Sequence, residues 1–276
     1  MTAALERRAR LASAAFLATL AIAALAADWV APYQPEEQFR ETIAAAPSSR
    51  FWLGTDDLGR DRFSRLIHAT RISLLIAPAA ALLSVVLAAS AGIAAATRTG
   101  LIGNLLMGAA DITLSLPWLL LLLTVRSLLP LDVTPWASLT LTFALLGAIG
   151  WAGPARVIRA AIRELLVSDF VISARGRGLS KSRVFLCHVL PSARPVVAAQ
   201  FWSAVPVFVL AEANLSFLGL GVTEPAASWG TMLKEMETVL AVGGNLLNQY
   251  WVFAPAALVF VSVLCLTILF PSRIST

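Results

Sequence analysis

The amino-acid sequence predicts an all-α fold, a polytopic bundle of six transmembrane helices. Hydrophobic residues make up 58% of the 276-residue chain and charged residues only 13%, and the mean hydropathy is +0.80. Soluble domains carry about 25% charged residues. The apolar residues are also grouped into long runs, and a helix needs about 20 such residues to cross a bilayer.

Six apolar runs follow one another along the chain. They are about Leu11–Val30, Leu74–Ala96, Leu105–Leu129, Trp136–Trp151, Val196–Leu220 and Tyr250–Phe270. The first run follows a basic start and contains Ala24-Leu25-Ala26, a pattern that also fits a cleaved signal peptide. Because much of the remaining chain is membrane-embedded, we expect this run to be retained as an anchoring helix.

Positive charge predicts which helix ends face the cytoplasm. The loop 152–195 is rich in Arg and Lys and the short loop 97–104 contains Arg98, whereas the short loop 130–135 carries only Asp132. Basic residues accumulate in cytoplasmic loops. Both termini are therefore expected in the cytoplasm, and the net charge of +5 needs no nucleic acid as a partner.

These patterns divide the chain into three parts. They are an N-terminal transmembrane helix (1–30), a periplasmic segment (31–71) and a five-span core (72–276) with a cytoplasmic loop at 155–195. Within that loop, residues 157–175 and 180–190 have the spacing of two short helices, separated by Gly176 and Gly178. Ser180 is placed to cap the second helix, and Pro191 and Pro195 are expected to end it. The residues leave open whether this basic loop docks a protein or binds anionic lipid headgroups.

No pattern in the chain predicts catalysis. The stretch GRGLSKS (176–182) lacks the Gly that a phosphate-binding loop has directly before Lys-Ser. His68 and His188 are expected on opposite sides of the membrane, and Cys187 and Cys265 have no metal-ligand spacing. We therefore predict no catalytic, cofactor-binding or metal site in this chain.

Ionisable residues inside apolar runs are the best functional candidates, because burying charge is costly. Asp111 is predicted to be a structural acid that pairs with a basic residue such as Arg98. Glu212 either lines a translocation path or makes structural contacts with Ser or backbone groups, and the residues favour the structural role. The other path or gate candidates are Ser216, Trp229 and Met232.

Two polar segments are expected on the outer side. In GTDDLGRDRFSR (54–65) the charges alternate in sign, which fits a self-satisfying ionic cap or a docking surface. Residues 223–240 are predicted to form an amphipathic helix, with Met232, Leu233, Met236, Val239 and Leu240 on one side. This helix either partly gates the outer mouth or rests on the bilayer.

Three blocks of the sequence resemble a known family. They are LGTDDLGRDRFSRLIHATRISL (53–74), SDFVISARGRGLSKSRVFLCHVLPSA (168–193) and LAEANLSFLGLGVTEPAASWGTML (210–233). They are similar to inner-membrane permease subunits of binding-protein-dependent ABC importers, in particular the C-type subunit of the dipeptide, oligopeptide and nickel branch. The resemblance implies a type I importer (MetI-like) fold in the bacterial inner membrane.

The second block resembles the cytoplasmic EAA loop, by which such permeases contact an ATPase. The resemblance implies that the contacting residues are Ser173, Ala174, Arg175, Arg177, Gly178, His188, Leu190 and Pro191. The chain departs from the motif where Ile172 replaces the acid and Ser173 the first Ala, at Gly176 and Arg177, and at Ser192. Its C-terminal FPSRIST also lacks the usual tail.

The resemblance also implies partners. They are a homologous B-type permease, one or two ABC ATPase subunits that hold ATP and Mg²⁺, a periplasmic or lipid-anchored solute-binding protein, and membrane lipids. The implied cargo is a peptide or similar small solute, with a nickel chelate as a further possibility. An ion-driven secondary transporter is the alternative, but the chain shows no convincing internal repeat.

Overall fold

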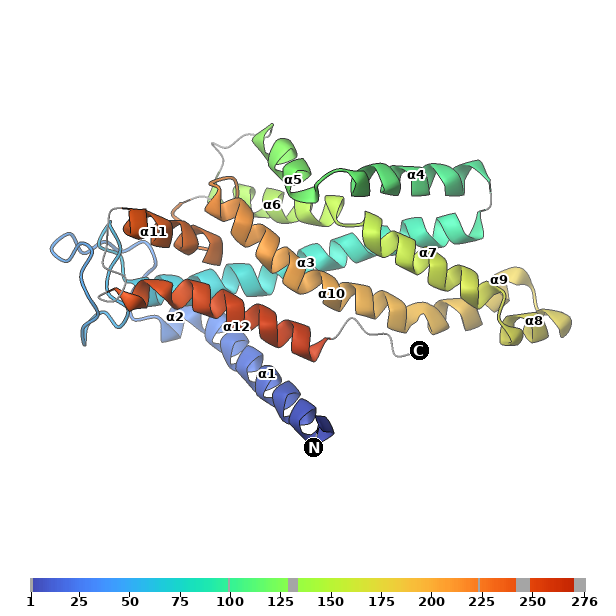
Figure 1. Ribbon diagram of the computed structural model, residues 1–276, viewed down its shortest axis with the longest axis horizontal. Coiled ribbons are helices and arrows are strands. Elements are labelled where there is room, and N and C mark those ends of the chain that lie inside the picture. The colour runs from blue at the N-terminus through green and yellow to red at the C-terminus, as the bar shows by residue number, and fades with distance from the viewer. Residues whose placement is uncertain (1, 99, 129–133, 223, 242–248, 271–276) are drawn as a thin grey trace. The chain divides into compact units, whose positions relative to one another are not determined.

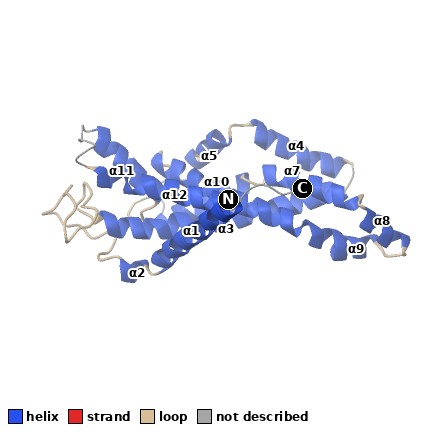
Figure 2. Cartoon of the chain, turned by 60° about the horizontal axis from the view of Figure 1, so that its bottom comes forward, coloured by secondary structure: helices blue, strands red, loops and turns tan. Residues whose placement is uncertain are grey.

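The computed structural model describes residues 2–98, 100–128, 134–222, 224–241 and 249–270. Over these residues the chain is helical apart from its connections and one long irregular segment, so the predicted all-α fold is confirmed (Figure 1 and Figure 2). The elements are α1 (Thr2–Leu25), α2 (Ala27–Val30), α3 (Arg62–Thr97), α4 (Leu101–Ser115), α5 (Trp118–Ser127), α6 (Pro135–Ile149), α7 (Ala152–Leu166), α8 (Asp169–Gly176), α9 (Lys181–Val184), the π-helical turn η1 (Phe185–Val189), α10 (Leu190–Phe217), α11 (Trp229–Ala241), the 3-10 turn η3 (Tyr250–Phe253) and α12 (Ala254–Leu269).

Five helical segments in the described residues are long and apolar enough to cross a membrane, and α4 with α5 makes a sixth if that bent pair is one span. The five are Ala4–Leu25, Arg62–Thr97, Trp136–Leu166, Lys181–Phe217 and Tyr250–Leu269. Each of the six apolar runs of the sequence thus corresponds to helix, although several bounds differ from those predicted.

The sequence predicted a single span for the third apolar run. The structure instead has two helices there, α4 and α5, with a bend of 90° between them. Leu116 ends α4 in an extended conformation, with φ −87° and ψ 138°. Pro117 follows it, and a proline disfavours the helical conformation of the residue before it. The bend therefore has a local cause in the sequence.

The helix of the second run begins at Arg62, a dozen residues before the predicted Leu74. Asp61 sets this start, because its Oδ2 accepts hydrogen bonds from the Ser64 backbone N–H at 2.8 Å and from Ser64 Oγ at 2.6 Å. A side-chain acceptor just before the first turn satisfies N–H groups that would otherwise lack a partner. The charged block 54–65 therefore runs directly into α3.

The prediction that Pro191 and Pro195 end a helix is wrong, because α10 continues through both to Phe217. The π turn η1 precedes them, and within it the Leu190 N–H donates to the carbonyl of Phe185, five residues back. A π turn already departs from the i−4 hydrogen-bond pattern, which a proline cannot continue. The i−4 hydrogen-bond pattern is therefore interrupted at η1, but the helix continues beyond it.

The described residues form two compact units. The first comprises 2–79, 125–143 and 205–270, and within it α1 and α12 lie side by side (Figure 1). The irregular segment, residues 31–61, is held together by aromatic contacts. The centre of the Phe39 ring lies 4.8 Å from the centre of the Tyr33 ring and 5.1 Å from that of Phe51. The Arg50 guanidinium lies 4.8 Å from the centre of the Phe39 ring, a favourable cation–π distance.

The second unit comprises 80–124 and 144–204. Its core joins α3, α4, α7, α8, α9, η1 and α10 through small and branched apolar side chains: Ala88, Ala95, Ala96, Met107, Ala155, Ile158, Ile162, Val171, Ala174, Val184, Val189 and Ala193. The backbones of α3 and α7 approach closely at Gly92, where an added Cβ would lie 2.7 Å from the Ala155 carbonyl oxygen. Small residues permit such close helix packing in membranes.

Candidate functional site

The prediction of one helix over 157–175 is wrong, because the structure divides it at Val167 and Ser168 into α7 and α8. The second predicted helix, over 180–190, begins as α9, and α8 and α9 are both anchored on the core of the second unit. Val171 and Ala174 of α8 and Val184 of α9 are buried. Between the helices, Gly178 has φ +84°, in the left-handed region that glycine adopts at little cost. Ser180 caps α9 as predicted, its Oγ accepting from the Arg183 N–H at 3.4 Å.

The other side of this helix pair is exposed and carries both basic and apolar side chains. We call it the coupling surface, defined by Phe170, Ile172, Arg175, Arg177, Lys181, Arg183 and Leu186. Ile172, at the position where the motif has an acid, is 58% exposed. Exposed apolar residues among positive charges indicate an interaction surface, whereas a face that only meets solvent is typically charged and polar throughout.

The predicted ATPase-contacting residues divide by exposure. Ser173, Arg175, Arg177 and Gly178 are exposed, His188, Leu190 and Pro191 are half-buried, and Ala174 is buried. Ala174 therefore anchors α8 on the core instead of facing outward. The remaining seven stay available to a partner at least in part.

Glu212, in α10, is completely buried and bonded to two serines. Its Oε1 accepts from Ser216 Oγ at 2.7 Å and its Oε2 from Ser73 Oγ at 2.9 Å. The Trp229 backbone N–H donates to Ser73 Oγ at 3.1 Å, and the Trp229 indole donates to Thr70 Oγ1 at 3.1 Å. These contacts with serine hydroxyls are of the kind that the structural alternative predicted, and the role of Glu212 in transport stays a prediction.

The other gate candidates are equally enclosed. Ser216, Trp229 and Met232 are each at most 1% exposed. The predicted amphipathic helix exists as α11, and its first residues pack inward. Gly230 allows this, because a Cβ there would collide with Ala213 and Ser216 of α10. Trp229 therefore attaches the start of α11 to α3, and Gly230 lets that start approach α10.

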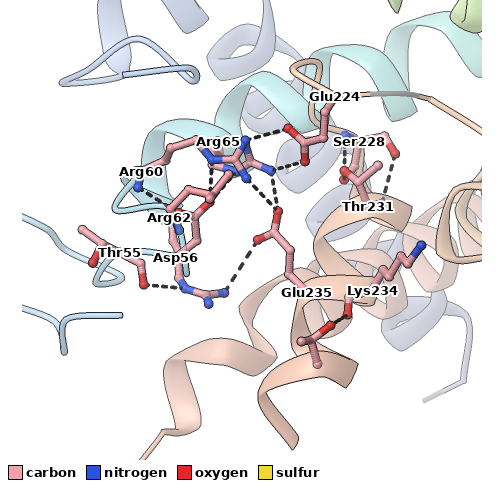
Figure 3. A network of polar contacts seen from close by, with 12 residues as sticks. Thr55, Asp56, Arg60, Arg62, Arg65, Glu224, Ser228, Thr231, Lys234 and Glu235 are labelled. Atoms are coloured by element: carbon pink, nitrogen blue, oxygen red, sulfur yellow. Dashed lines mark hydrogen bonds and ion pairs between the residues drawn. The ribbon is translucent and has the colours of Figure 1, made fainter. Parts of the chain in front are cut away.

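A second polar cluster joins the charged block to α11, and Figure 3 shows its members converging. We call it the arginine network. Arg60 Nε lies 2.7 Å from Asp56 Oδ2, and Arg60 Nη1 lies 2.6 Å from Glu224 Oε2. Arg65 pairs with Glu224 at 3.3 Å and more closely with Glu235. Arg65 is completely buried and Asp56 nearly so.

Burial and the neighbouring charged groups shift the pKa values in this network in opposite directions. Burial lowers the pKa of Arg60, but hydrogen bonds with Glu224 and Asp56 outweigh that effect and raise the pKa above its ordinary value. Burial raises the pKa of Glu235, and the charge of Arg65 opposes the rise. Burial prevails, and the pKa of Glu235 lies above its ordinary value.

The ionic cap predicted for the charged block is correct only in part. The Asp56–Arg60 pair lies within the block, but the remaining acids, Glu224 and Glu235, come from about 160 residues later in the chain. Asp61 caps α3 and Asp57 is exposed. The sequence carries no local signal for the long-range partners, since both glutamates lie in a segment that resembles a surface helix.

Arg126 of α5 is a buried charge that the sequence patterns did not single out. Its Nη2 donates to Ser138 Oγ at 3.1 Å, and that hydroxyl donates to the Gly221 carbonyl at 2.8 Å. The side chain is completely buried. A single arginine inside the apolar run 105–129 is the signal that would have found it.

Asp111 pairs with Arg156 of α7, Oδ1 to Nη2 at 3.1 Å, and not with the predicted Arg98. The two side chains are 51% and 54% exposed. The prediction considered only basic residues near Asp111 in the sequence. In the structure α4 packs along α7 and brings Asp111 close to Arg156 instead. The divergent C-terminal residues 271–276 and Asp132 lie outside the described residues.

Comparisons with known proteins agree with the resemblance seen in the sequence. Residues 69–271 match the family model described as "Binding-protein-dependent transport system inner membrane component". The di/tripeptide transport system permease protein DppC of Pseudomonas aeruginosa is 34% identical over 261 residues, which cover 92% of this chain and 82% of that protein. The nickel transport system permease protein NikC of Escherichia coli K12 is 32% identical, with 90% and 86% covered. The oligopeptide transport system permease protein OppC of Bacillus subtilis is 35% identical, with 68% and 60% covered.

Proposed function

The chain belongs to the family of binding-protein-dependent transport system inner membrane components, and from that premise we propose how it works with its partners. It is a multi-pass permease subunit of an ABC importer, a transport subunit and not an enzyme. It pairs in this proposal with a homologous permease. One or two ATPase subunits hold ATP and Mg²⁺, and a periplasmic or lipid-anchored binding protein delivers the cargo.

The proposed cargo is a peptide or a similar small solute. Two of the relatives are named for di- and tripeptides and for oligopeptides, and one for nickel. A nickel chelate is therefore the second candidate. Uptake assays with a labelled dipeptide and with ⁶³Ni²⁺, each in cells that lack the chain and in complemented cells, distinguish the two.

The coupling surface is the proposed ATPase contact. Its basic side chains favour an acidic groove on the ATPase, and the exposed Ile172 and Phe170 favour an apolar patch within that groove. A bilayer surface would attract the same charges. The observation that carries the proposal is the set of exposed apolar residues on α8 and α9, helices whose other side is buried in the core.

The helix that begins at the coupling surface supports a direct mechanical route. Residues Lys181–Phe217 form one long helical segment through α9, η1 and α10. ATP binding would close the ATPase dimer and displace α8 and α9, and α10 would carry that displacement into the membrane. The orientation with both termini in the cytoplasm belongs to this proposal, and reporter fusions at each end check it.

Co-purification tests the coupling surface. The tagged chain is solubilised gently from its native membrane, and the ATPase recovered with it is quantified by mass spectrometry. Arg177→Glu, which reverses a charge on the surface, is expected to reduce ATPase recovery at least fivefold without changing membrane insertion. Lys234→Glu on α11 is the matched control. Equal ATPase recovery for both variants and the parent chain would show that the contact lies elsewhere.

A further inference from the structure

We propose that a polar stripe on α4 and α7 lines the aqueous passage of the importer and contacts charged groups of the solute, an inference that rests on the proposed function. The stripe consists of Asn104, Asp111 and Ser115 of α4 and of Arg156, Arg159 and Arg163 of α7. All six belong to the second unit, so their relative placement does not depend on how the two units are arranged.

Helix α4 has three distinct sides. Gly103, Met107 and Ala110 are buried. Ile102 and Leu105 are 48% and 62% exposed, and together with the exposed Ala109 they form an apolar side. Between these sides, polar or small residues recur at 104, 108, 111 and 115, a spacing that places them on one line along a helix. The exposed surface of α4 is thus part apolar and part polar.

Helix α7 continues the polar line. Arg156, Arg159 and Arg163 recur at i, i+3 and i+7 and share one side of the helix, next to the buried Ala155, Ile158 and Ile162. The ion pair between Asp111 and Arg156 joins the two helices at 3.1 Å. The stripe is therefore continuous across the α4–α7 pair, with three positive charges and one negative charge.

The polar side of α4 and α7 is not expected to face lipid, because its side chains are charged. α4 is half of the bent candidate span, and α7 lies within the candidate span Trp136–Leu166. An ionised side chain facing hydrocarbon is strongly disfavoured, yet both members of the pair are half-exposed. The leucine and isoleucine side of α4 suits lipid or another apolar surface. The polar side requires water. Because α7 leads into the basic loop that the proposal places in the cytoplasm, we assign this water to the cytoplasmic end of the passage.

The charges of the stripe indicate the class of solute. Guanidinium groups bind carboxylates in a bidentate manner, and a carboxylate accepts hydrogen bonds from an ammonium group. Three arginines and one aspartate therefore suit a zwitterionic solute with one or more carboxylates, as in a short peptide. Asp111 and Arg156 hold each other in place until the solute groups exchange with them.

Thiol accessibility tests whether the stripe meets water in the passage. The parent carries Cys187→Ser and Cys265→Ser, and it is assembled with its partners in nanodiscs after ATP-driven uptake has been verified in liposomes. Ser115→Cys reports on the polar side, and Ala109→Cys, which lies about 120° around the helix at 3.6 residues per turn, reports on the apolar side. We expect a charged methanethiosulfonate reagent to modify Ser115→Cys at least tenfold faster, with a rate that changes between the nucleotide-free and ATP-trapped states.

Two outcomes of that experiment would overturn the proposal. Equally slow modification of both positions would place the stripe in lipid or in a protein interface. Fast modification of Ser115→Cys that is identical in both nucleotide states would place it on a permanently hydrated surface outside the passage. Because uptake by the parent is measured first, either result leaves the assignment as an importer subunit intact.

Reversal of the ion pair tests the contact with solute. The double variant Asp111→Arg with Arg156→Asp preserves an ion pair between α4 and α7 but exchanges the charges presented to the passage. We expect normal assembly with the ATPase and at least a fivefold decrease in uptake of the zwitterionic solute. Uptake equal to that of the parent would show that the pair serves only to join the helices.

Discussion

Arg65 of α3 and Glu235 of α11 form an ion pair in which the arginine side chain is completely buried and the glutamate side chain is 18% exposed. The pair lies at the centre of the arginine network, which also connects to Glu224 and Asp56. Together with the Glu212 cluster, it attaches α11 to α3 at two places. Helix α11 is therefore held by charge and by buried hydrogen bonds, not by apolar packing alone.

Removing Arg65 is expected to destabilise the chain severely. Arg65→Ala removes the nearest cationic partner of the largely buried Glu235 and leaves Asp56 with Arg60 alone, and breaking a buried pair in this way costs about 3–5 kcal/mol. Urea unfolding in a mild detergent measures the loss. Arg50→Ala is the control, because Arg50 is exposed and is expected to cost less than about 1 kcal/mol. Equal losses for the two variants would contradict the network's structural role.

The raised pKa of Glu235 predicts a pH dependence of stability. Burial makes the folded state bind this proton more tightly than the unfolded chain does, so the charged carboxylate lowers stability above the folded pKa. As pH falls through the folded pKa towards the ordinary carboxyl value, that cost is relieved. The wild type should therefore gain unfolding free energy relative to Glu235→Gln over this window.

Arg65 modulates this titration, because its positive charge opposes the rise in the pKa of Glu235. When Arg65→Ala is present in both proteins, the stability difference between the chain that keeps Glu235 and the Glu235→Gln variant should begin to change at higher pH. Denaturant unfolding between neutral pH and about pH 4 measures this difference with and without Arg65. A difference that is constant across the window would show that Glu235 does not titrate there.

Glu212 is predicted to act through stability and not through contact with solute. Glu212→Ala leaves the hydroxyls of Ser73 and Ser216 buried without their acceptor, which costs about 1–3 kcal/mol. Glu212→Gln retains one acceptor and should cost less. Uptake, measured per amount of folded protein, is expected to be unchanged in both variants. A selective change in the uptake of basic solutes by Glu212→Gln would instead place this residue in the passage.

Two glycines of the basic loop, Gly176 and Gly178, provide a test variant and a matched control. Neither has an atom within 4 Å of an added Cβ, but only Gly178 has a left-handed φ, of +84°. Alanine in that conformation costs about 1–2 kcal/mol, so Gly178→Ala should weaken ATPase binding by up to about thirtyfold. Gly176→Ala is expected to leave binding unchanged. Binding of the purified ATPase to the solubilised permease compares them, and identical affinities would mean that the turn is not needed for docking.

Close helix packing at Gly92 gives a second matched pair. Gly92→Ala would bring Cβ to 2.7 Å from the Ala155 carbonyl oxygen and 3.2 Å from Ile158 Cβ, and overpacking of this kind costs about 1–3 kcal/mol. At Gly153 the nearest atom, Leu114 Cδ2, is 4.0 Å away. Gly153→Ala should therefore be neutral or stabilising by up to about 1 kcal/mol. Thermal unfolding of both variants checks the predicted order.

Much of this molecule could be predicted from local patterns. Apolar runs marked the helices, because a membrane helix must satisfy its backbone internally and present apolar side chains over its whole length. Ser180 and Gly178 marked the turn in the basic loop through capping and backbone chemistry. Three motif blocks identified the family, and the matches over 69–271 agree.

Helix bounds were predicted less well, and each error has a local cause. The Asp61 cap begins α3 early, Pro117 bends the third run, and the π turn η1 allows α10 to pass through Pro191. These effects depend on one or two residues that an average over an apolar window does not detect.

The sequence by itself determined that this chain is a membrane permease, how many apolar runs it has, and which loop carries the basic surface. Only the tertiary structure decided which charges meet. Arg65 pairs with Glu235, Asp111 pairs with Arg156 instead of Arg98, and Ser73 donates to Glu212. The physical reason is that helix propensity and hydropathy act over a few neighbouring residues. A charged side chain, in contrast, takes the partner that helix packing brings within about 4 Å, however far away it lies in the sequence.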